Sequence, residues 1–173
     1  MRLLQRVSIV LGLVILLAVG ARADKVTSDF DHNTNFSKYK TFMWVQAPNT
    51  TDPFMQDRIM EAVNSQLNIR GLREVKEGAD LAVGANMVTE EKQAWETFYN
   101  GTDWGWGPGW SQTTETTYLV GTLTVDLFDA CSHKIIWQGV GVDTVSSKPE
   151  KRTKDNNKQI EKMFRYFPYG KEK

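Results

Sequence analysis

The sequence predicts an α+β fold: a two-layer sandwich in which two helices cover one face of a mostly antiparallel sheet. Two observations lead to this prediction. Several segments alternate between apolar and polar residues, as strands do, whereas two segments carry apolar residues at helical spacing. Most strand-like segments also follow one another without an intervening helix, which argues against a doubly wound parallel sheet. The predicted order is β-β-α-β-β-β-α.

The predicted strands are separated by short polar turns. In residues 40–45, for example, Phe42 and Trp44 fall on one side of the chain and the intervening residues on the other. Polar clusters at residues 31–35 and 129–133 predict turns, the first ordering an opening hairpin and the second connecting a closing one. Strands are predicted over residues 26–30, 40–45, 80–89, 116–128 and 134–144, with a brief further strand over 72–75.

The first helix has clear start and stop signals. Asp52 suits the N-cap, Pro53 the first helical position and Gly71 the left-handed residue beyond the end. Between these signals the apolar residues recur every four positions: Met55, Ile59, Val63 and Leu67. After a polar linker over residues 146–155, a second helix is predicted from about residue 154 to 166. Its inward side chains are expected to be Ile160, Met163, Phe164 and, just beyond, Phe167.

The strand pattern is lost over residues 90–115, which we interpret as an insertion rich in Gly, Trp and Thr. Large aromatic side chains gain free energy when they leave water. The first expectation is therefore that the insertion folds back and covers the sheet. The alternative is an exposed aromatic surface for a partner, a glycan or a membrane interface. The candidate ligand-binding residues in that case are Tyr99, Trp104, Trp106 and Trp110.

The first 23 residues are predicted to be a cleavable signal peptide. Arg2 and Arg6 precede an apolar run over residues 7–19, and residues 21–23 supply a small-x-small cleavage pattern that ends at Ala23. The run is shorter than the roughly 20 residues that a membrane-spanning helix needs. We therefore expect a periplasmic product without stable membrane insertion. Anchoring through an uncleaved leader is the alternative.

Composition narrows the classes of partner. Cleavage after Ala23 leaves residues 24–173, enough for one domain. Since three of the 21 basic residues leave with the leader and no acidic residue does, 18 basic residues face 21 acidic ones, a net charge of about −3. Nucleic-acid binding needs a basic face, and the locally basic residues 148–158 also contain Glu150 and Asp155. The sequence thus does not favour a nucleic-acid partner.

None of the familiar metal-binding patterns is complete, so no metal or cofactor is expected. Residues 29–33 begin like a calcium loop, but Thr34 stands where the loop needs Gly and Lys40 where it needs Glu. His32 and His133 lie in separate predicted turns, which does not favour a zinc site.

No catalytic group stands out either. Cys131, the single cysteine, is expected to be a small, partly buried side chain in a turn, where no pocket would pair it with His133 as a nucleophile. Asp126 and Asp143 lie at different distances from the closing turn, so they are not expected to face each other.

Several stretches together resemble the DUF4136 family. They cover nearly all of the mature chain in the family's order, and the strongest is residues 121–130 followed by 134–139. The others are residues 26–31, 36–44, 58–59, 71–72, 79–81, Tyr118 and 164–168. The resemblance implies an envelope protein of unknown function, often a lipoprotein, with no catalytic residues to transfer. This chain has no cysteine after its leader to carry a lipid.

The sequence therefore predicts a non-enzymatic domain that binds or scaffolds an unidentified component of the cell envelope. A small-ligand or glycan binder that uses the aromatic insertion is the first alternative. An envelope hydrolase with converging carboxylates is the second.

Overall fold

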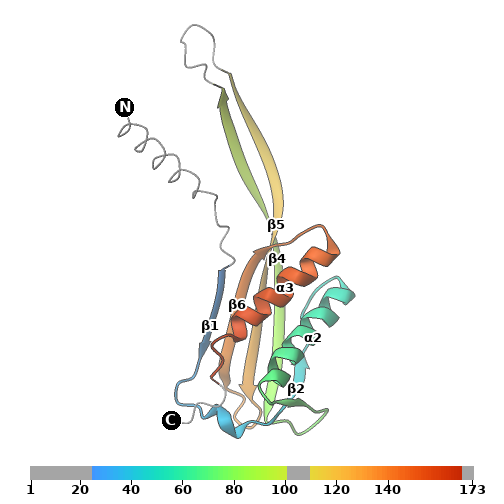
Figure 1. The fold of residues 1–173 in the computed structure, drawn as a ribbon, viewed down its shortest axis with the longest axis vertical. Helices are drawn as coiled ribbons and strands as arrows, with labels where there is room; N and C mark the ends of the chain where they lie inside the picture. The colour runs from blue at the N-terminus through green and yellow to red at the C-terminus, as the bar shows by residue number, and fades with distance from the viewer. Residues whose placement is uncertain (1–24, 101–109, 169–173) are drawn as a thin grey trace, which may run out of the picture.

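The computed structural model describes residues 25–100 and 110–168, with side chains described for residues 25–95 and 113–168. These residues form a six-stranded sheet with two helices on one face (Figure 1). The predicted α+β two-layer sandwich is confirmed. The predicted leader and its cleavage site after Ala23 lie outside the described residues.

The elements follow the predicted order, with the brief strand included. They are β1 Lys25–Phe30, the 3-10 turn η1 Phe36–Lys38, β2 Thr41–Gln46, α2 Pro53–Ile69, β3 Arg73–Glu74, β4 Leu81–Asn100, β5 Trp110–Asp129, β6 Ile135–Thr144 and α3 Pro149–Phe164. In the sheet the strands lie in the order β1-β6-β5-β4-β2-β3.

The first two strands do not form the predicted opening hairpin. β1 pairs antiparallel with β6 at one edge, whereas β2 pairs in parallel with β4 and β3 at the other. The helix α2 between β2 and β4 provides the crossover that parallel neighbours require. The turn at residues 31–35 is nonetheless ordered as expected, because Asp31 accepts hydrogen bonds from the Asn33 amide and the Thr34 hydroxyl.

Helix α2 agrees closely with its sequence signals. Asp52 caps it by accepting the amides of Phe54 and Met55, and Gly71 adopts a left-handed φ of 82° just beyond its end. The residues that recur every four positions are all buried: Met55, Ile59, Val63 and Leu67.

Helix α3 begins earlier than predicted, at Pro149 instead of about residue 154. Its first turn is polar on every side and so lacks the apolar spacing on which the prediction relied. The predicted inward residues Ile160, Met163 and Phe164 are buried, as is Phe167. Phe164 stacks on the fully buried Trp137 of β6 with ring centroids 4.5 Å apart.

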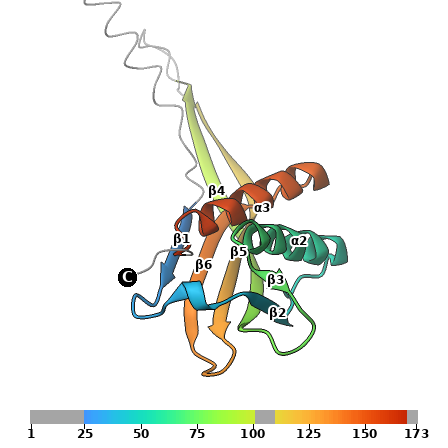
Figure 2. The same cartoon turned by 60° about the horizontal axis from the view of Figure 1, so that its bottom comes forward.

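Two glycines of β6 allow α3 to lie close to the sheet. A Cβ at Gly139 would stand 2.6 Å from the Trp137 ring and 3.0 Å from the Met163 Cβ, and one at Gly141 would stand 2.4 Å from the side chain of Gln159. Together with α2, helix α3 covers one face of the sheet (Figure 2).

Candidate functional site: the projecting β4–β5 arm

The most prominent feature of the fold is a long two-stranded ribbon that projects beyond the sheet (Figure 1). β4 and β5 pair without a break from Leu81↔Asp129 to Asn100↔Trp110. Their outer neighbours end much sooner, since β2 pairs no further than Gly84 and β6 no further than Val120. We call residues 89–100 and 110–119 the arm.

The arm overturns part of the predicted insertion over residues 90–115. Residues 90–100 and 110–115 are strand, and the described part of the arm extends away from the body instead of folding back over the sheet. Threonine explains the strand conformation, because its branched side chain favours extended backbone and Thr113, Thr114, Thr116 and Thr117 lie in β5. The usual alternation of apolar and polar residues is missing because neither face of the arm is covered.

The two faces of the arm carry different side chains. Cross-strand partners share a face, so Glu91 lies opposite Leu119 and Trp95 opposite Glu115 on the face that continues the helix-covered side of the sheet. All four side chains are exposed, Trp95 by 64% and Leu119 by 44%. This set of four residues is the acidic-apolar face of the arm.

Both edges of the arm are open. Among the described residues, no strand pairs with β4 beyond Gly84 or with β5 before Leu119 on their outer sides. Open edges offer backbone N–H and C=O groups to another chain, and an isolated two-stranded ribbon is marginally stable in water. The arm thus has the exposed groups and the reach of a contact element.

The predicted ligand-binding residues fall at the far end of the arm. Tyr99 pairs through its backbone with Ser111, and Trp110 with Asn100, so the two lie on adjacent rungs. Trp104 and Trp106 lie outside the described residues, as do the side chains of Tyr99 and Trp110. A role in ligand binding for these four residues stays a prediction.

A cluster of polar contacts at the opposite end of the sheet was not predicted. The Asp129 carboxylate accepts hydrogen bonds from Tyr39 Oη at 2.8 Å, Lys38 Nζ at 3.1 Å and the Ser132 amide at 2.8 Å. It also accepts the Cys131 amide and the Ser132 hydroxyl. The Ser132 amide, followed by Tyr39, holds the pKa of Asp129 well below its usual range. Each of these donors favours the ionised form of Asp129. The carboxylate thereby joins η1 to the β5–β6 turn, a contact that we call a clasp.

Asp80 makes a similar clasp between β4 and β2. Its Oδ2 accepts the amides of Lys40 at 2.7 Å and Thr41 at 3.0 Å, together with the Thr41 hydroxyl. The Lys40 amide is the main cause of its lowered pKa. Both oxygens of Asp129 and Oδ2 of Asp80 accept hydrogen bonds from other parts of the fold, so this arrangement is structural. Two of the donors of Asp129, Lys38 and Tyr39, come from about 90 residues earlier in the chain, which no local sequence signal reveals.

The other sequence candidates are not brought together. Asp126 accepts a hydrogen bond from Gln138 at 2.7 Å, and Asp143 lies opposite Gly121, so the two carboxylates do not face each other, as predicted. Cys131 is exposed, not partly buried, in its turn. Within residues 25–100 and 110–168, no group of three His, Cys, Asp or Glu side chains could hold a metal ion.

The hollows of the described domain are small or open. A cavity of about 20 Å³ lies between the start of α3 and the base of the arm, beside Met55 and the buried Gln159, with room for about one water molecule. An open groove between α2 and α3 carries Glu61 and Glu161, both exposed. Asp143 and Asp155, both half-buried, line the cavity together with Arg152.

In the part of the chain that is described, neither helix is long and apolar enough to cross a membrane. No curated protein matches the chain.

Solved structures share the fold at low sequence identity. The PelC dodecamer from Paraburkholderia phytofirmans is 14% identical, with a TM-score of 0.51 over 80% of this chain and 94% of PelC. A PDZ domain protein from Parabacteroides distasonis is 13% identical, with a TM-score of 0.56 over 86% of this chain and 36% of its own.

A structure from the family suggested by the sequence is also similar. A DUF4136 family protein from Bacteroides thetaiotaomicron is 14% identical, with a TM-score of 0.54 over 84% of this chain and 96% of its own. The family described as "Domain of unknown function (DUF4136)" matches residues 26–169, which confirms the resemblance. The chain belongs to the DUF4136 family.

Proposed function

We propose that this chain is an exported, non-enzymatic scaffolding module of the bacterial cell envelope, and that the arm is its contact element. One observation carries the proposal: the arm is a ribbon with two open edges and an exposed Trp95, and it projects beyond the body of the domain (Figure 1). Exposed apolar groups beside unpaired strand edges are features of protein interaction sites.

Two further observations support a binding role over catalysis. The Asp129 and Asp80 carboxylates are committed to holding the fold together. The PelC structure that shares the fold is a dodecamer, so this architecture is compatible with assembly. Export and release into the periplasm rest on the leader sequence over residues 1–23.

The experiment is to trim the arm. Thr89 and Gly121 face each other in register, so residues 90–120 can be replaced by an Asn-Gly turn, which suits a two-residue hairpin. A photo-activated cross-linking residue at Thr117 on the arm should capture an envelope component, whereas the same residue at Lys76, exposed in the β3–β4 loop, should not.

The trimmed chain should fold and lose the interaction. Circular dichroism checks the fold, and mass spectrometry of the protein from the periplasmic fraction should give Asp24 as the first residue. Equal cross-linking from Thr117 and Lys76 would refute the arm as the contact element, and a mature chain that still begins at Met1 would refute cleavage of the leader.

The alternative is a glycan or small-ligand site at the far end of the arm. The aromatic residues gathered in this part of the sequence favour it, namely Tyr99, Trp104, Trp106 and Trp110, because aromatic rings are suited to stacking on sugars or other flat ligands. Titration of the Trp104→Ala and Trp106→Ala variants with envelope glycans, followed by tryptophan fluorescence, tests it. Unchanged spectra of the wild-type chain would remove this alternative.

A further inference from the structure

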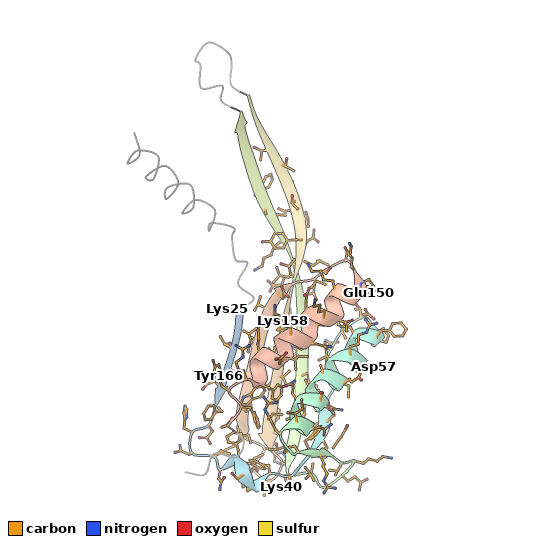
Figure 3. All side chains as sticks on the ribbon, viewed as in Figure 1. Lys25, Lys40, Asp57, Glu150, Lys158 and Tyr166 are labelled. Carbon is orange, nitrogen blue, oxygen red and sulfur yellow. The ribbon has the colours of Figure 1, made fainter. Side chains whose placement is uncertain are left out.

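The charges of this protein are segregated onto two surfaces. The whole sequence has 21 basic and 21 acidic residues, yet the described strands of the arm carry four Glu and one Lys. The opposite charge gathers on α3, where a row of basic side chains follows the helix on its outer side. Lys158 lies midway along α3, and Tyr166 lies just beyond its end (Figure 3).

Helical geometry produces the basic row. Lys151, Lys154 and Lys158 recur at intervals of three and four, which places them on one face, and Arg165 continues the same line. The buried residues Ile160 and Met163 lie on the opposite face, so the row points outward. All four basic side chains are exposed, and within the described residues none of the four forms an ion pair.

Acidic residues of α3 flank this row on both sides. Glu150 and Glu161 follow one margin of it, and Asp155 is half-buried at the other. Glu150 and Glu161 each lie four residues before a member of the row, so they neighbour it on the helix surface, as the sequence had indicated, but the row still carries four exposed basic side chains against these two exposed acidic ones. The four basic side chains extend over about 21 Å of helix, at about 1.5 Å per residue.

The acidic-apolar face of the arm matches this row. Glu91 and Glu115 are four rungs apart in the ladder, or about 13 Å at the usual strand rise, so both carboxylates can lie over the row at once. Leu119 lies beside Glu91, and Trp95 lies beside Glu115, each on the same rung. A Trp ring attracts lysine and arginine cations, and the methylene stems of lysine can cover Leu119.

The arm cannot reach its own α3 with this face. It runs away from the helices in both views (Figures 1 and 2), and in the described part of the chain no Cα of β4 or β5 comes within 8 Å of α3. We infer that the acidic-apolar face of one copy's arm docks on the basic row of α3 in a second copy. The partner in the scaffolding role proposed above is, on this inference, the same chain.

Such a contact is head-to-tail, because arm and α3 are different surfaces. Each copy therefore donates one arm and accepts another, which generates a closed ring or an open chain. The ion pairs are exposed, so single contacts are weak and screened by salt. Assembly should accordingly rise with protein concentration and fall with ionic strength.

Charge reversal on either side tests the inference. The arm-reversed chain carries Glu91→Lys and Glu115→Lys, and the helix-reversed chain carries Lys154→Glu and Lys158→Glu. A control matched to the arm-reversed chain carries Asp57→Lys and Glu77→Lys, which makes the same charge change at exposed positions outside both surfaces. The full chain, produced with its own leader, is studied by sedimentation velocity at about 50 mM and about 500 mM salt, where the screening length falls several-fold.

The wild-type chain and the control should associate at low salt and dissociate at high salt. Each reversed chain alone should associate about tenfold to a hundredfold more weakly, since favourable pairs become repulsive ones. An equimolar mixture of the two reversed chains should associate again, because the basic arm of one then meets the acidic helix of the other. Circular dichroism establishes that each variant is folded.

Several results would overturn the inference: a monomeric wild-type chain at low salt, reversed chains that associate like the control, or a mixture that stays monomeric. A monomeric wild-type chain that binds phosphatidylglycerol vesicles through the basic row would assign that row to a membrane instead. A monomeric chain whose Thr117 still cross-links to a different envelope protein would refute self-association and leave the scaffolding role intact. Loss of all arm cross-linking would remove both proposals.

Discussion

Replacement of Asp129 by Asn should destabilise the domain much more than the same replacement at Asp126, three positions earlier on β5. Asp129 accepts five hydrogen bonds, from Tyr39, Lys38, Cys131 and two groups of Ser132. Asp126 accepts one, from Gln138. The pair of variants thus compares a clasp with an ordinary strand position.

The magnitude follows from what Asn can replace. Its carbonyl oxygen can still accept the amides of Cys131 and Ser132, but its NH₂ group would face Tyr39 Oη and Lys38 Nζ. The bond from Tyr39 to a charged acceptor contributes about 1.5–3 kcal/mol, whereas the pair with the half-exposed Lys38 contributes at most about 1 kcal/mol. The Asp129→Asn chain should therefore lose about 2–3 kcal/mol, and the Asp126→Asn chain less than about 1 kcal/mol.

The difference should depend on pH. Because the pKa of Asp129 is lowered in the folded chain, its ionised form contributes stability that is fully present above the unfolded value of about 4. That contribution decreases as pH falls below about 4 towards the folded pKa. The stability gap between wild type and Asp129→Asn should be constant from about pH 8 to 5 and shrink below about pH 4.

Urea unfolding followed by circular dichroism measures the free energy of unfolding at each pH. Equal stability of the Asp129→Asn and Asp126→Asn chains at pH 7 would refute the clasp. A gap that stays constant below pH 4 would refute its electrostatic origin.

Three further predictions concern packing, capping and exposure. Gly139→Ala should cost about 1–3 kcal/mol of stability, because its Cβ would meet the buried Trp137 ring. Gly84→Ala should not, because its Cβ would make only ordinary contacts at 3.5 Å or more. Equal urea midpoints for the two variants would contradict the close approach of α3. Asp52→Ala should lower stability by about 1 kcal/mol through loss of the α2 cap, and an unchanged thermal midpoint would count against the cap. The Cys131 thiol should react completely with a thiol reagent in the native protein, whereas a reaction that needs denaturant would show that it is covered.

Local features of the sequence were sufficient to predict the helices and most strands. The apolar residues of α2 recur at helical spacing between a capping Asp52 and a terminating Gly71, and all of these signals act within a few residues of one another. Helix α3 and strands β1, β2 and β6 followed from the same reasoning. The start of α3 was missed because its first turn contacts no core and so carries no periodic signal.

The arm was missed for a related reason. Strand prediction relies on one buried and one exposed face, and neither face of the arm is covered. The threonine-rich residues 113–117, directly before the predicted strand over 116–128, were the signal that could have revealed that the strand begins earlier. Pairing of β1 with β6 and of β2 with β4 is likewise non-local, so it depended on the complete sheet.

The sequence by itself therefore determined the α+β class, the helices with their buried faces, and the family resemblance. The tertiary structure decided which surfaces face outward and which distant groups meet. Asp129 receives Tyr39 from 90 residues away, and Glu91 joins Glu115 on one face only because β4 and β5 pair in that register. Side-chain spacing along a helix or strand is set by local backbone geometry, but strand register and the meeting of distant side chains depend on the packing of the whole chain.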